Sequence, residues 1–170
     1  MIKILIADDQ QLIRDSIKII LESNEDFSVT DTVGNGKEVL SSIEKNKPNV
    51  ILMDVRMPMM DGTVCTKHVK EKYPDIKVII LTTFDDDDFI FSALKYGASG
   101  YLLKGGSPAD LFTAIRTVAQ GGAMINPDIT EKVFRLFSKM AQANYTISVN
   151  DQETKDFSKS EWCVIQQVGL

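Results

Sequence analysis

Five short runs of Ile, Leu and Val recur along the first part of this chain, separated by segments of mixed character. The runs are continuous rather than alternating, which is typical of strands that are covered on both faces of a sheet. We therefore predict buried parallel strands over 2–7, 27–33, 49–53, 76–81 and 99–103.

The segments between these runs carry apolar residues at helical spacing, or begin and end at helix-capping residues. We predict five helices. The first has Ile13, Ile17, Ile20 and Leu21 on its buried face, the second begins after Asn35, and the third runs from about Thr63 to Lys72. The fourth runs from the Asp85–Asp88 segment to Gly97, and the fifth is capped by Ser107 and has Leu111, Ile115 and Val118 on its buried face. Strand alternating with helix five times predicts an α/β fold, a doubly wound five-stranded parallel sheet, over residues 1–121.

The rest of the chain has a different pattern. Residues 122–156 contain one predicted amphipathic helix, from Asn126-Pro127 to about Ala141, followed by a polar linker. A last helix begins in the segment 157–170, where Ser158 or Ser160 is the candidate cap.

Composition narrows the class of protein. Of 170 residues 44% are hydrophobic and 25% charged, and the net charge is −5, which argues against a nucleic-acid-binding surface over the whole molecule. We see no apolar stretch of membrane-spanning length and no cleavable leader, so we expect a cytoplasmic protein without a membrane partner.

Polar residues stand at the ends of four predicted strands. Asp8 and Asp9 follow the first, Asp54 the third, Thr82 the fourth and Lys104 the fifth. Because the carboxyl ends of parallel strands meet at one edge of a sheet, we expect these side chains to converge.

Carboxylate oxygens such as those of Asp9 and Asp54 suit Mg²⁺ (or Mn²⁺), which can also hold a phosphoryl oxygen. Asp54 is the best candidate nucleophile because a tight loop follows it and can direct the backbone carbonyl of Arg56 at the metal. Lys104 and Thr82 would then contact further phosphoryl oxygens.

Together these residues resemble the receiver domain of bacterial response regulators. The resemblance rests on Asp8-Asp9, Asp54 with Met57-Pro58 and Asp61-Gly62, Leu81-Thr82-Thr83-Phe84, and Tyr101-Leu102-Leu103-Lys104. It implies a flavodoxin-like (βα)5 fold with strand order 2-1-3-4-5. It also implies that Asp54 accepts phosphate from a sensor histidine kinase in a Mg²⁺-dependent step catalysed by the receiver itself. Asp8, Asp9, Asp54 and the Arg56 carbonyl would hold the metal, and Thr82 and Tyr101 would form a switch pair.

The sequence of residues 97–104 is similar to that of the NarL/FixJ (LuxR-type) branch, and residues 157–162 are similar to the start of its helix-turn-helix domain. The resemblance divides the chain into a receiver (1–121), a linker with one helix (122–156) and the first helix of an incomplete LuxR-type domain (157–170). It implies a homodimer on phosphorylation, with promoter DNA bound only through the missing part. Gly105-Gly106 departs from the pattern, since many receivers have a proline after the lysine.

Other interpretations stay open at this point. The chain could be a stand-alone receiver that acts by protein–protein interaction. A phosphohydrolase of the haloacid-dehalogenase type needs a second aspartate where Arg56 stands, and a flavin or nucleotide carrier needs a glycine-rich loop where Asp8-Asp9 stands. Individually, Asp8 and Asp9 could be a helix cap, Thr82 an ordinary strand residue and Tyr101 a packed aromatic.

Overall fold

The structure is a computed structural model that describes residues 1–83, 87–127, 129–135, 137–139 and 141–142. In this part of the chain strands and helices alternate as the apolar pattern predicts. The elements are β1 (Ile2–Ala7), α1 (Gln11–Glu22), β2 (Phe27–Val33), α2 (Gly36–Lys45), β3 (Val50–Asp54), α3 (Gly62–Lys72), β4 (Lys77–Thr82), α4 (Asp87–Lys95), β5 (Gly100–Leu103), α5 (Pro108–Ala119) and β6 (Met124–Ile125).

The strands form one parallel sheet in the order β2-β1-β3-β4-β5-β6. The predicted doubly wound α/β sheet and the order 2-1-3-4-5 are therefore confirmed. The number of strands was wrong by one, because β6 pairs with β5 at the edge and places Met124 beside Gly100. A strand of only two residues carries no periodicity that a sequence pattern can detect.

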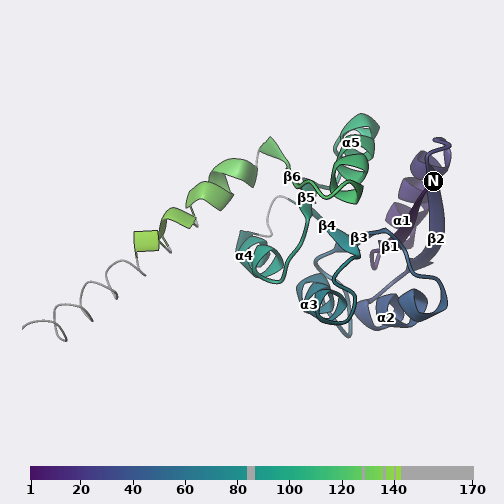
Figure 1. Cartoon of the computed structure of the whole chain (residues 1–170), viewed down its shortest axis with the longest axis horizontal. Helices are drawn as coiled ribbons and strands as arrows, with labels where there is room; N and C mark the ends of the chain where they lie inside the picture. The colour runs from purple at the N-terminus through teal and green to yellow at the C-terminus, as the bar shows by residue number, and fades with distance from the viewer. Residues whose placement is uncertain (84–86, 128, 136, 140, 143–170) are drawn as a thin grey trace, which may run out of the picture. The chain divides into compact units, whose positions relative to one another are not determined.

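Helices cover both faces of this sheet, with α1 and α5 on one side and α2, α3 and α4 on the other (Figure 1). Every residue of β3 is buried, which explains why its sequence is a continuous apolar run rather than an alternating one. On the α1 and α5 side, Leu52 and Leu81 pack with Ile115 in one hydrophobic core. Each such side chain stabilises the fold by about 1.5–3 kcal/mol when fully buried.

Side-chain caps set where three helices begin. Asn35 accepts hydrogen bonds from the backbone N–H groups of two residues in the first turn of α2, and Ser107 accepts one from Asp110 in α5. These caps confirm the predicted starts of both helices. Asp61 caps α3 in the same way, and this cap holds the loop that follows Asp54.

The chain divides into two compact units, Met1–Lys132 and Val133–Leu170. The first contains all the strands listed above. In the second, residues 133–135, 137–139 and 141–142 are helical, as the amphipathic pattern predicts, and Phe134 and Phe137 are exposed. The predicted linker over 144–156 and the predicted helix in 157–170 lie outside the described residues. Among the residues described, no helix has both the length and the apolar character to cross a bilayer.

Candidate functional site

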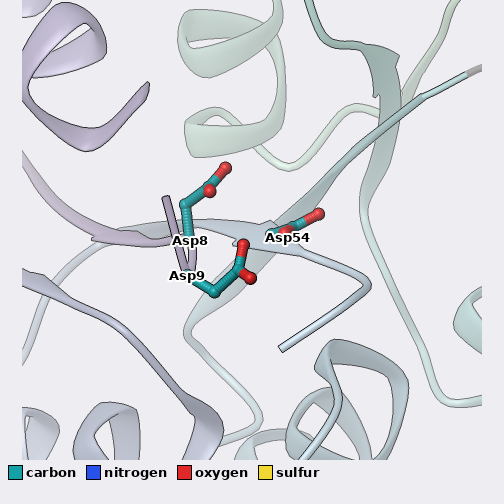
Figure 2. A group of neighbouring side chains, drawn as sticks. All are labelled: Asp8, Asp9 and Asp54. Atoms are coloured by element: carbon teal, nitrogen blue, oxygen red, sulfur yellow. The ribbon is translucent and has the colours of Figure 1, made fainter. Parts of the chain in front are cut away.

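The ends of four strands bring the predicted site residues to one edge of the sheet. Asp54 is the last residue of β3 and Thr82 the last of β4, while Asp8 and Asp9 follow β1 and Lys104 follows β5. Figure 2 shows Asp8, Asp9 and Asp54 as close neighbours. Each of these three offers a carboxylate oxygen within 4.8 Å of the others.

Asp8 is held on both of its carboxylate oxygens. Its Oδ1 accepts a hydrogen bond from the backbone N–H of Gln10 at 2.9 Å, and its Oδ2 lies 2.7 Å from the Lys104 ammonium. The residue is 1% exposed. A buried carboxylate needs such partners, so Asp8 belongs to the site and is not a solvated turn residue.

Asp54 shares the same ammonium, since Lys104 Nζ lies 2.9 Å from its Oδ1. The backbone N–H of Arg56 also donates to this carboxylate, while the Arg56 side chain is exposed. Burial, together with the negative charge of Asp8, raises the pKa of Asp54 to about 6 against the opposing effect of Lys104. Burial therefore disfavours the ionised form of Asp54, and a further positive charge in the site would favour it.

Lys104 is the positive centre of the site. Burial of its ammonium disfavours the charged form, but the hydrogen bonds and charges of Asp8 and Asp54 outweigh that cost, and the pKa of Lys104 lies above its usual value. Its backbone N–H donates to the carbonyl of Thr82 at 2.7 Å, which fixes the start of the side chain at the end of β4.

The charges of the cluster fit a divalent cation. Three carboxylates and one ammonium carry a formal net charge of −2, three negative charges less one positive. An ion of the Mg²⁺ class balances that charge and prefers oxygen ligands such as these. The donor set therefore suits a hard divalent cation.

Thr82 is the last residue of β4, and Tyr101 lies in the neighbouring strand β5. Thr82 is buried and its hydroxyl donates to the carbonyl of Thr83 at 3.0 Å, so in this conformation that bond is directed along the loop. Tyr101, in β5, is fully buried. The inward position that the resemblance implies for this ring is thus already present here.

Gly62 sets how closely the loop after β3 returns to the site. Its N–H donates to the carbonyl of Val55 at 2.9 Å, and a Cβ added to it would overlap the carbonyl oxygen of Asp54. Gly105 makes the turn after Lys104 with a left-handed φ of 86°, a conformation that glycine adopts without strain.

The sequence analysis missed one contact of the site. Arg14, in α1, donates from Nη1 to the backbone carbonyls of Asp8 and Asp9, at 2.6 and 3.1 Å. The available signal was a basic residue one turn into the helix that follows the acidic pair. That signal is weak, because arginine is common on exposed helix surfaces.

Comparisons with known proteins identify the family. A family model described as the response regulator receiver domain matches residues 4–116. The transcriptional regulatory protein DegU of Brevibacillus brevis is 36% identical over 160 residues, a match that covers 94% of this chain and 65% of DegU. The chain thus spans a little under two thirds of that relative.

Solved structures agree with this match. A DNA-binding response regulator of the LuxR family from Staphylococcus aureus is 30% identical, with a TM-score of 0.66 over 70% of this chain and 99% of the other. A two-component response regulator of the LuxR family from Aurantimonas has a TM-score of 0.75 over 81% of this chain and 99% of the other, at 24% identity, which speaks for the fold alone.

The fold and the acidic cluster define an α/β protein with a candidate divalent-cation site at the carboxyl edge of a doubly wound sheet. The chain belongs to the response regulator receiver family. The family resemblance drawn from the sequence is confirmed, and these relatives are signalling regulators rather than classical enzymes.

Proposed function

We propose that Asp54 is the phosphoacceptor of a two-component signalling protein and that a sensor histidine kinase is the donor. The observation that carries the proposal is the half-buried Lys104 ammonium, which lies within 2.9 Å of a carboxylate oxygen of Asp8 and of Asp54. A lysine placed so is in reach of a phosphoryl group added to Asp54.

The transfer needs little covalent chemistry from the protein. A carboxylate oxygen of Asp54 attacks phosphorus, the P–N bond of the donor phosphohistidine breaks, and the imidazole leaves with the electron pair. Asp8, Asp9, Asp54 and the Arg56 carbonyl would hold Mg²⁺ (or Mn²⁺). When bound, the ion offsets negative charge on the phosphoryl oxygens. The receiver catalyses this step and the later hydrolysis of its own acyl phosphate, and acts on no other substrate.

Two residues would contact the new phosphoryl group. Lys104 exchanges its contact with Asp54 for a phosphoryl oxygen, and the Thr82 hydroxyl turns from the Thr83 carbonyl to another. Tyr101, already buried in β5, would complete the switch. These movements need only side-chain rotations at the sheet edge.

The output would be transcription regulation in the cytoplasm. DegU, whose name describes a transcriptional regulatory protein, extends well beyond the part that this chain matches. We propose a receiver over 1–121, a linker over 122–156 and a LuxR-type DNA-binding domain that begins in 157–170. Phosphorylation would promote a homodimer, and promoter DNA would be bound by that domain alone.

The test is phosphoryl uptake by the whole chain from acetyl phosphate. We expect mass spectrometry to show the addition of one phosphoryl group in the presence of Mg²⁺, and none with EDTA or with Asp54→Asn. Asp15→Asn, a matched change on the exposed surface of α1, should leave uptake intact. A wild-type chain of unchanged mass would contradict the proposed function.

A further inference from the structure

Arg14 binds the backbone of Asp8 and Asp9, two of the three residues of the carboxylate cluster. One guanidinium nitrogen, Nη1, donates to the carbonyls of both Asp8 and Asp9, at 2.6 and 3.1 Å. The arginine is half-buried, and Gly34 lies against the same nitrogen, since a Cβ added there would meet it at 3.6 Å. The guanidinium therefore lies beside Gly34 and against the loop that carries Asp8 and Asp9.

The acidic loop needs such a support. Asp8 and Asp9 are adjacent in the chain, and their carboxylates repel each other and that of Asp54. Gln10, at the N-cap of α1, makes no side-chain cap hydrogen bond, and the side-chain bond within this turn, which Asp8 Oδ1 accepts from the Gln10 N–H, does not support the Asp9 carboxylate. The Asp9 side chain is exposed, which means that packing contributes little to its orientation.

A guanidinium is well suited to the task. Its donors lie in a rigid plane, so one group can bind two neighbouring carbonyls and fix their relative orientation. Hydrogen bonds to the carbonyls of Asp8 and Asp9 restrain the backbone from which both carboxylates project, and so limit the positions that these side chains can reach. The positive charge of Arg14 also offsets part of the electrostatic repulsion among the carboxylates.

We propose that Arg14 is a positioning residue for the metal site. It keeps Asp8 and Asp9 aimed at Asp54 before the ion arrives, so that the ion meets a preformed set of oxygens. This inference rests on the proposed function. Its consequence is specific: loss of Arg14 weakens metal binding, while the phosphoryl chemistry at saturating metal is unchanged.

The test measures metal binding directly, on the whole chain, by titration with Mn²⁺ and detection of the free ion by electron paramagnetic resonance. We expect Arg14→Met to raise the dissociation constant about tenfold, the lower end of the range for residues that support metal ligands. Arg14→Lys should show a smaller loss, because an ammonium keeps the charge without the planar fork. The matched control is Lys18→Met, on the same helix, where Lys18 forms only an exposed pair with Glu22 at 3.8 Å.

Phosphorylation by acetyl phosphate then separates positioning from a merely structural role. In Arg14→Met the Mn²⁺ concentration for half-maximal rate should rise by the same factor, with the limiting rate retained. Equal metal affinity in wild type and both Arg14 variants would overturn the inference, even if Arg14→Met melts at a lower temperature. If Arg14→Met does not fold, Arg14→Lys carries the comparison with Lys18→Met. A wild-type chain that binds Mn²⁺ and takes up phosphate, with unaffected Arg14 variants, leaves the proposed function standing; a wild-type chain that does neither overturns both.

Discussion

The ammonium of Lys104 reaches across the end of β4 to lie 2.9 Å from the carboxylate of Asp54, although their strands, β5 and β3, are not neighbours in the sheet. Sheet topology alone makes this contact, since the two residues are far apart in the chain. The same ammonium lies 2.7 Å from the carboxylate of Asp8, so Lys104 links the carboxyl ends of β1 and β3.

Removing Lys104 should destabilise the metal-free protein. Lys104→Met leaves the buried carboxylates of Asp8 and Asp54 without their shared cation, and we expect a loss of about 3 kcal/mol in the free energy of unfolding. Urea titration in EDTA measures it, and added Mg²⁺ should recover part of the loss. Lys72→Met, which breaks an exposed pair with Glu44, should cost much less, so equal losses would contradict the account.

Ionisation of Asp54 should make the free energy of unfolding depend on pH. The pKa of Asp54 is raised from 3.8 to about 6, so between these pH values the folded state binds more protons than the unfolded state. Its contribution to stability is therefore present below pH 4 and is lost as the pH rises through about 6. We expect wild type in EDTA to lose stability relative to Asp54→Asn over this window, measured by urea unfolding at matched pH. A difference between the two proteins that stays constant with pH would show that the carboxyl is not perturbed.

Metal binding should raise the melting temperature. A ligand present at 100 times its dissociation constant stabilises the folded state by about 2.7 kcal/mol. We expect Mg²⁺ at such an excess to shift the melting of wild type upward and to leave Asp9→Ala nearly unmoved, because one of three clustered carboxylates is gone. Equal shifts in both proteins would place the ion elsewhere.

The approach of Gly62 to Asp54 should tolerate no side chain. Gly62→Ala puts a methyl group into the carbonyl oxygen of Asp54, and since the neighbour is backbone it cannot move aside cheaply. We expect a loss of about 2 kcal/mol or more, with reduced Mg²⁺ affinity. Gly106→Ala is the control, because its Cβ would meet the Leu103 carbonyl at an ordinary 3.5 Å. If the two alanines cost the same, close packing of this loop is not what holds the site.

Much of this architecture could be predicted because both faces of the sheet are covered. Strands such as Val50–Asp54 are apolar up to their last residue, and that polar last residue marks the edge where ligands bind. The order of the strands came from the family resemblance, since apolar runs do not say which strands are neighbours. The edge strand Met124–Ile125 escaped notice because two residues have no pattern.

The contacts inside the site were harder to foresee. Sequence predicted that Asp8 lies near the metal but not that its oxygens bind Gln10 and Lys104. Arg14 was missed because it acts through backbone carbonyls, which every residue has. Residue types indicate the chemistry of a site, whereas pairings made through the backbone depend on the fold.

The most direct measurement of the central claim locates the modified residue. The chain is phosphorylated with acetyl phosphate and Mg²⁺ and then treated with borohydride, which reduces an aspartyl phosphate to homoserine, and its peptides are sequenced by mass spectrometry. Our account predicts homoserine at position 54 and at no other aspartate. Homoserine at position 8 or 9, or none at all in a phosphorylated chain, would contradict it.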